Sequence, residues 1–198
     1  KDANGCTDTK SIDIIKKLSV TPEITKEIDC TAFADATITL TVTDGLFTGA
    51  DTTPDFAYEV NFNGGGYGAS VNFGNDTRTT VFTATNGPGT YQFRITDLNG
   101  CQIESSIVTI DPKEADPTAT TTFTNPSCPT DLDGTLTIIA SLGVAPYEYS
   151  IDGVTWQPED TFTGLGAGTV NYVVRDFKQC LFNGSETLVD PTPLDAIA

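Results

Sequence analysis

Histidine and methionine are absent from this 198-residue chain, and basic residues are scarce, with 10 Lys and Arg against 27 Asp and Glu. Without histidine the commonest general base is missing, so the composition argues against an enzyme. A formal net charge of −17 argues against nucleic acid and anionic membranes as partners, because both are bound through basic patches. The acidity favours solubility, or a surface that recruits Ca²⁺.

Long apolar runs are also missing. No stretch is apolar enough to span a bilayer, and the chain does not open on a secretory signal pattern. Long helical patterns are absent, whereas Thr, Gly, Asp and Asn are plentiful. Short strands at regular spacing, separated by Gly, Pro and Asn, are typical of an all-β protein.

One phrase occurs two and a half times along the sequence, as residues 89–101, residues 168–180 and, in its last part only, residues 2–6. In both full copies apolar and polar residues alternate, and the run ends at an Asp that is followed by a turn and a Cys. Alternation of period two closed by a turn signal predicts a half-buried strand entering a hairpin. Such self-similarity indicates repeated domains.

The repeat predicts an all-β fold class with two tandem immunoglobulin-like β-sandwich domains, preceded by the last strand of a previous repeat. We expect a tail strand in residues 1–16, a first sandwich in 17–113 and a second in 114–198. The first sandwich is longer because residues 45–56 form an insertion. Since the chain begins inside a repeat, we expect it to be a piece of a longer protein that carries any targeting signals.

The correspondence continues outside the shared phrase, and residues 58–64 match residues 147–153. Glu59 follows Tyr58 and Glu148 follows Tyr147, and successive side chains of a strand point to opposite faces of the sheet. If the tyrosines face the core, both carboxylates are expected on the solvent face. No motif marks either of them as catalytic.

Five cysteines occupy two kinds of position in the repeat. None lies in a CxxC pair, so disulfides in an oxidising compartment are favoured over a zinc site. One arrangement pairs Cys30 with Cys101 and Cys128 with Cys180, each within a repeat. Another pairs Cys6 with Cys30 and Cys101 with Cys128 across the linkers. Against the first stands the immunoglobulin topology, which puts the two positions at opposite poles of one sandwich, while bonded Cα atoms must lie within about 7 Å.

The second repeat carries a specific pattern, made of Pro146, Tyr147, Tyr149, Ser150, Asp152, Gly153, Trp156, Phe162, Gly164, Leu165, Asp176 and Cys180. This pattern resembles the SprB-type repeat of giant surface adhesins in gliding Bacteroidetes. The first repeat resembles it at the Tyr58 strand and at residues 97–101, but departs from it in between. The resemblance implies export by the type IX secretion system, location at the bacterial cell surface, and a role in adhesion or gliding.

Acidic clusters supply the candidate metal ligands. Asp131 and Asp133 lie beside a turn without the spacing of an EF-hand, so they are either turn residues or calcium ligands. The linker residues Asp111, Glu114 and Asp116 either are solvated or bind an ion between the domains. The sequence predicts no cofactor other than calcium.

Aromatic residues supply the candidate ligand contacts. Trp156 and Tyr67 would stack on a sugar ring if they are exposed, and core packing is the alternative for Trp156. Asp51-Thr52-Thr53 resembles the Bacteroidetes O-glycosylation motif, with Thr52 as the acceptor.

The expected function is that of a non-catalytic repeat segment of a large secreted cell-surface adhesin, serving as spacer or adhesive stalk. Its expected partners are extracellular surfaces or polysaccharides and neighbouring repeats, with no nucleic acid and no membrane insertion. A discrete carbohydrate-binding module and an accessory domain of a secreted enzyme are the alternatives.

Overall fold

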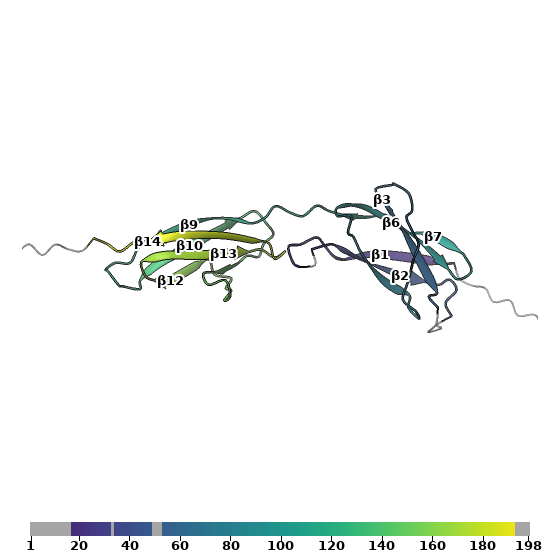
Figure 1. Cartoon of the computed structure of the whole chain (residues 1–198), viewed down its shortest axis with the longest axis horizontal. Helices are drawn as coiled ribbons and strands as arrows, with labels where there is room; N and C mark the ends of the chain where they lie inside the picture. Colours follow the sequence, from purple (N-terminus) through teal and green to yellow (C-terminus); the bar gives the residue numbers. More distant parts are fainter. Residues whose placement is uncertain (1–16, 33, 49–52, 193–198) are drawn as a thin grey trace, which may run out of the picture. The chain divides into compact units, whose positions relative to one another are not determined.

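The structure is a computed structural model that describes residues 17–32, 34–48 and 53–192. All regular elements in these residues are β-strands, which confirms the all-β fold class (Figure 1). In the described part of the chain no helix is long and apolar enough to cross a membrane. The predicted tail strand in residues 1–16 lies outside the described residues.

The chain forms two compact units. Unit 1 contains the residues up to Glu27 and Ala36–Asp111, whereas unit 2 contains Ile28–Asp35 and the residues from Pro112 onward. The boundary after Asp111 lies two residues before the predicted one. Ile28–Asp35 lies in the sequence within the first repeat but in space within unit 2, which the repeat pattern did not predict.

Unit 1 is built from two antiparallel sheets. One has the order β1 (Ser19–Lys26), β2 (Thr37–Thr43), β5 (Thr79–Thr83). The other has the order β4 (Val71–Asn72), β3 (Phe56–Phe62), β6 (Gly89–Asp97), β7 (Gln102–Glu104), and β8 (Val108–Ile110) also pairs with β6.

Unit 2 repeats this plan. One sheet has the order β12 (Thr161–Leu165), β10 (Gly134–Ser141), β9 (Thr118–Thr124). The other has the order β11 (Glu148–Ser150), β13 (Gly168–Arg175), β14 (Leu181–Leu188). In unit 1 the first, second and fifth strands oppose the third, sixth and seventh, and in unit 2, which has six strands, the first, second and fourth oppose the third, fifth and sixth. Both are immunoglobulin-like arrangements.

Alternating side chains form the two cores. In β2 the apolar residues point inward and the threonines outward, and Ile38, Leu40 and Val42 are fully buried. The equivalent Leu136 and Ile138 of β10 are also fully buried, and they pack with Tyr149, Tyr172 and Val174. These two strands therefore bury matching positions of the two repeats.

Strand pairing corrects the predicted match between residues 58–64 and 147–153. Phe56 lies opposite Asp97 in unit 1, and the register that pairs Glu148 with Arg175 places Tyr147 opposite Asp176. The residue of unit 2 that is equivalent to the buried Tyr58 is thus the buried Tyr149 rather than Tyr147. A shift of two residues leaves every side chain on the same face of the sheet, so the alternating pattern alone does not reveal it.

Candidate functional site

The turn between β13 and β14, residues 176–180, is held by one buried carboxylate. Asp176 Oδ1 accepts a hydrogen bond from the Cys180 N–H at 2.8 Å, and its Oδ2 accepts one from the Val144 N–H at 3.0 Å. Its side chain is 2% exposed. The carboxylate therefore ties the turn that carries Cys180 to the connection between β10 and β11.

Residues 97–101 of unit 1 form the same turn. Asp97 Oδ1 accepts hydrogen bonds from the N–H groups of Asn99 and Cys101 at 3.0 and 2.9 Å, and Oδ2 accepts one from Leu46 at 3.2 Å. We call residues 97–101 and 176–180 the cysteine turns. In both copies of the repeated sequence, the Asp therefore anchors the turn and the Cys is the residue that it holds in place.

A glycine beside each buried aspartate lets the backbone come close to the carboxylate. Gly143 has a φ of +66°, and a Cβ there would lie 2.8 Å from Asp176 Oδ2. Its counterpart Gly45 has a φ of +70° and lies beside Asp97. Both positions need glycine, because the backbone is left-handed and the carboxylate or a neighbouring side chain fills the space.

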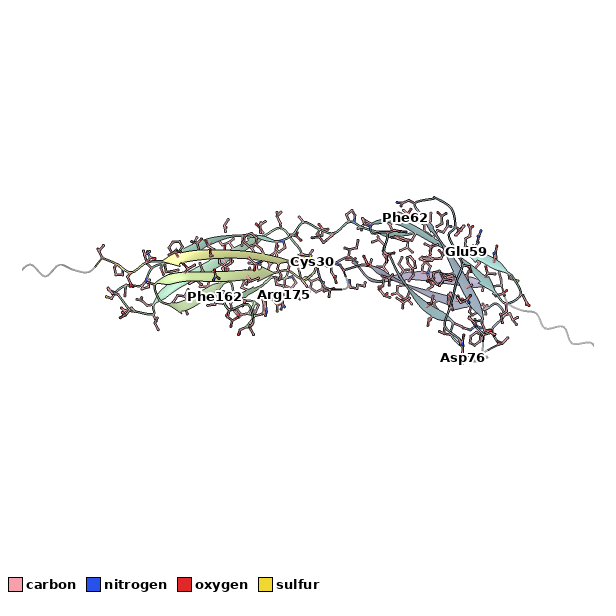
Figure 2. All side chains as sticks on the ribbon, in the orientation of Figure 1. Cys30, Glu59, Phe62, Asp76, Phe162 and Arg175 are labelled. Atoms are coloured by element: carbon pink, nitrogen blue, oxygen red, sulfur yellow. A yellow bond between two sulfur atoms is a disulfide. The ribbon has the colours of Figure 1, made fainter. Side chains whose placement is uncertain are left out.

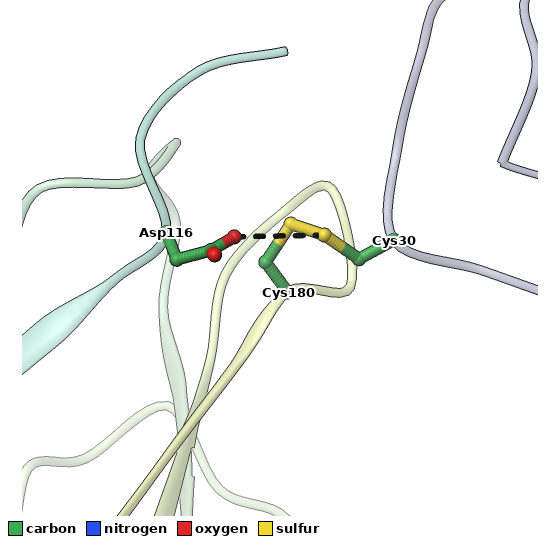
Figure 3. A group of neighbouring side chains, drawn as sticks. All are labelled: Cys30, Asp116 and Cys180. Carbon is green, nitrogen blue, oxygen red and sulfur yellow. Dashed lines mark hydrogen bonds between the residues drawn. A yellow bond between two sulfur atoms is a disulfide. The ribbon is translucent and has the colours of Figure 1, made fainter.

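Cys30 and Cys180 form a disulfide within unit 2, with their Cα atoms 4.9 Å apart (Figure 3). The Cys30 N–H also donates to the carbonyl of Lys178 in the cysteine turn, at 2.9 Å. Asp116 Oδ1 lies 3.8 Å from Cys30 Sγ. The bond therefore fixes Ile28–Asp35, a segment of the first repeat, onto the cysteine turn of the second.

Both predicted disulfide arrangements are wrong in their pairing, because Cys101 and Cys128 are free and exposed. The reason is the polarity of the sandwich. Asn125, near Cys128, accepts a hydrogen bond from Val189 just beyond the last residue of β14, whereas Cys180 precedes its first residue. The eight residues of β14 span roughly 25 Å. A bond within the repeat is therefore geometrically impossible.

An aromatic ring, an arginine and a glutamate form a stack on the outer face of the second sheet in each unit. In unit 1 the guanidinium of Arg94 lies 4.2 Å from the ring centre of Tyr67 and donates to Glu59 Oε2 at 2.6 Å. Figure 2 labels Glu59 of this stack. The hydrogen bond from Arg94 lowers the pKa of Glu59. Burial, and then the nearby Glu104 carboxylate, raise the pKa of Tyr67.

In unit 2 the guanidinium of Arg175 lies 4.1 Å from the ring centre of Trp156 and donates to Glu148 Oε2 at 2.6 and 3.0 Å. Trp156 is half-buried and lies outside the core cluster, so the core-packing alternative for this residue is wrong. Both predicted ligand residues instead cover an arginine. A stacked ring of this kind offers only part of its surface to a ligand.

Replacing Arg175 with Lys is expected to loosen the Trp156 stack. A lysine keeps the charge but loses the planar contact and the two-pronged hydrogen bonding, at a cost of about 1 kcal/mol at this half-exposed site. Trp156 is the only tryptophan, so its fluorescence should become more accessible to iodide quenching. Arg94→Lys makes the same change in unit 1 and should leave this fluorescence unaltered. Equal quenching in the wild type and Arg175→Lys would contradict the stack.

The predicted calcium ligands Asp131 and Asp133 lie in the connection between β9 and β10. Asp133 accepts hydrogen bonds from the N–H and hydroxyl of Ser127, at 2.9 and 2.6 Å, and these bonds lower its pKa. Its carboxylate thus has a local structural task. In the linker, Asp116 forms an ion pair with Lys113.

Within the described residues, one group combines three potential metal-ligating side chains, Cys30, Asp116 and Cys180, with ligand atoms within 4.8 Å. Its two sulfurs are joined in the disulfide and are not thiolates, the form in which cysteine binds metals. The acidic candidates Asp111, Glu114, Asp131 and Asp133 are not brought into this group. Thr52 lies outside the described residues.

Calcium binding by the acidic residues stays a prediction with a direct check. A cation that binds only the folded state raises the unfolding temperature, by an amount that grows with its concentration. Thermal unfolding in millimolar Ca²⁺ and in EDTA should differ by several degrees if Asp131 and Asp133 bind calcium. Asp131→Asn should then remove the difference, and coincident curves for the wild type would contradict calcium binding.

Comparisons with known proteins agree with the sequence pattern. Residues 120–155 match the SprB repeat family. The matched segment runs from β9 to just before Trp156 and includes Cys128. No curated protein matches the sequence.

Solved structures with distant similarity include a C-terminal 282-residue fragment of intimin bound to the translocated intimin receptor (12% identity, TM-score 0.39, 89% of this chain and 64% of that chain covered). They also include the mouse nectin-like molecule 4 ectodomain (12%, 0.31, 91% and 67%). A third is the Tp47 lipoprotein of Treponema pallidum (13%, 0.33, 91% and 53%). The chain thus spans less than two thirds of the intimin fragment.

Proposed function

We propose that the chain is a non-catalytic segment of tandem repeats from a large secreted cell-surface protein, and that it spaces and presents an adhesive surface in attachment or gliding. The observation that carries this proposal is the covalent anchor shared by successive repeats, in which Cys30 of the first is bonded to Cys180 of the second. The SprB match over residues 120–155 supports a surface-protein repeat. A disulfide is also the form in which cysteines persist outside the cytosol.

Two features shared by the repeats support this proposal. Each has a cysteine turn anchored by a buried aspartate, and each ring proposed to bind a ligand is stacked on an arginine. Repeated modules of this kind gain reach and avidity from their number, with no single strong site required.

Exposure on intact cells tests the proposal. Fab fragments raised against the chain should label unpermeabilised cells that produce the parent protein, and external protease should remove the label. Deleting the two repeats from the parent should weaken attachment of cells to a surface under flow. Labelling that requires permeabilisation would overturn the proposal.

Binding of polysaccharides separates the spacer from a carbohydrate-binding module. A spacer predicts that titration with extracellular polysaccharides gives no saturable binding that depends on Trp156 or Tyr67. Saturable binding that is lost in Trp156→Ala or Tyr67→Ala, with the circular dichroism spectrum unchanged, would instead establish the binding module.

A further inference from the structure

The two free cysteines occupy the same positions in their repeats as the two bonded ones. Cys101 follows its anchor Asp97 by four residues, as Cys180 follows Asp176, and both donate an N–H to that carboxylate. Cys128 and Cys30 each precede the first buried apolar residue of the next strand, Leu136 or Ile38, by eight residues. Each repeat therefore carries one cysteine of each kind, at opposite ends of its sandwich.

A hollow of about 210 Å³ lies beside Cys101 in unit 1. Its lining includes Leu18 and Gly45, together with Asp97 and Asn99 of the cysteine turn. In unit 2 the corresponding turn contacts the Cys30 segment, and Cys180 is only 2% exposed, whereas Cys101 is exposed. Unit 1 thus has a turn of the same construction, with an open space and a thiol facing solvent.

Hydrogen bonds within the loop that carries Cys128 hold the backbone around this exposed cysteine. Ser127, the preceding residue, is held by Asp133 through its N–H and its hydroxyl, and the Cys128 carbonyl accepts the Asp131 N–H at 3.1 Å. In the bonded loop, Asp29 plays the equivalent part and accepts hydrogen bonds from the N–H and hydroxyl of Thr31 at 3.1 and 2.8 Å. In both loops a carboxylate orders the chain next to the cysteine.

We propose that every junction of a tandem array carries a disulfide equivalent to Cys30–Cys180. Cys101 and Cys128 are then cysteines of two such junctions, and the partner of each lies in a further repeat. Cys101 takes the loop cysteine of a preceding repeat, in the way that Cys180 takes Cys30. Cys128 bonds to the cysteine turn of a following repeat. The proposal rests on the tandem organisation proposed above and adds the covalent partner of each cysteine. It identifies the hollow beside Cys101 as the seat of a loop equivalent to Ile28–Asp35.

Each such bond forms by exchange with a disulfide oxidant, which is a small-molecule or protein disulfide. The thiolate of one cysteine attacks that disulfide and displaces one thiolate from it. The thiolate of the second cysteine then displaces the other. Two protein thiols lose two protons and two electrons, and the oxidant is reduced to two thiols.

A tandem fusion tests the proposal. Residues 1–195 are followed directly by a second copy from residue 18 to residue 198, with Cys6→Ser in the first copy. Leu18 lies beside Gly45 as Pro117 lies beside Gly143, so the fusion preserves the spacing of the natural junction. Cys128 of the first copy and Cys101 of the second are then separated along the chain almost as Cys30 and Cys180 are, by about 150 residues.

The fusion is equilibrated in a glutathione redox buffer, alkylated and mapped by peptide mass spectrometry without reduction. The expected result is a bond between Cys128 of the first copy and Cys101 of the second, in more than nine tenths of the molecules. The other Cys101 and Cys128 lack partners and should remain alkylated, which makes them matched controls in the same molecule. A central pair alkylated as fully as the outer pair, or a statistical mixture of pairings, would overturn the proposal.

The proposal and the spacer function can fail separately. Labelling of intact cells by Fab fragments does not depend on this bond, so a free central pair with labelled cells would reject the repeated disulfide alone. Cys128→Ser in the first copy provides the second check, because Cys101 of the second copy should then become fully alkylated.

Discussion

Asp176→Ala is expected to destabilise unit 2 strongly. The substitution leaves the N–H groups of Cys180 and Val144 without their charged acceptor in a buried position. Each hydrogen bond to a charged group contributes about 1.5–3 kcal/mol, so the loss of two such bonds is expected to cost about 3–6 kcal/mol. Domains of this size are stable by only about 5–15 kcal/mol. Urea unfolding followed by Trp156 fluorescence measures the change, because the only tryptophan lies in unit 2.

Asp97→Ala is the matched control for this result. It removes the same anchor from unit 1, where the acceptors of Asn99, Cys101 and Leu46 are lost. The Trp156 midpoint should stay where it is, while the tyrosine signals of unit 1 in near-ultraviolet circular dichroism should be lost at lower urea. An unchanged Trp156 midpoint in Asp176→Ala would show that the aspartate is not the anchor of the turn.

Breaking the Cys30–Cys180 disulfide should give the second large effect. The bond joins residues separated by 150 positions, for which the loop-entropy relation gives about 5 kcal/mol when the whole chain unfolds. If unit 1 stays folded, the loop is already partly ordered and the effect on unit 2 is smaller. Cys30→Ser should therefore lower the urea midpoint of Trp156 and expose Ile28–Asp35 to amide hydrogen exchange, starting with the backbone N–H of residue 30.

Reductant gives an independent measure of the same bond. A reducing agent should shift the wild-type midpoint as far as Cys30→Ser does, and it should have no further effect on that variant. Cys128→Ser removes an exposed free thiol and should respond to reductant as the wild type does. If reductant leaves the wild-type midpoint unchanged, the disulfide does not hold the segment on unit 2.

Local patterns predicted the strands well, because each face of a sandwich strand repeats every two residues. The inward residues Ile38, Leu40 and Val42, and the turn that joins Asp97 to Cys101, follow directly from the alternation and the turn residues. The same alternation hides a shift of two residues, which is why Tyr147 was matched to Tyr58 in place of Tyr149.

The disulfide could not be found in this way, because it depends on which ends of two sandwiches carry cysteines. The immunoglobulin topology predicts that Cys30 and Cys101 lie at opposite poles, and both predicted arrangements pair each cysteine with one in the same repeat or with the next one across a linker. Cys180, the third cysteine after Cys30 along the chain, satisfies the distance requirement. The Trp156 stack was missed for a similar reason, since Arg175 comes from a strand distant in the sequence.

The closed ring formed by the disulfide has a mechanical consequence. When the chain is pulled from its two ends, the covalent path runs from Cys30 through the two sulfurs to Cys180, and the residues between them carry no tension once the path is taut. At about 3.4 Å per extended residue, the ring withholds roughly 500 Å of contour length. With the disulfide intact, the chain would extend little under force and would recover without refolding the residues inside the ring. With the disulfide reduced, those residues could unfold and add their contour length to the chain.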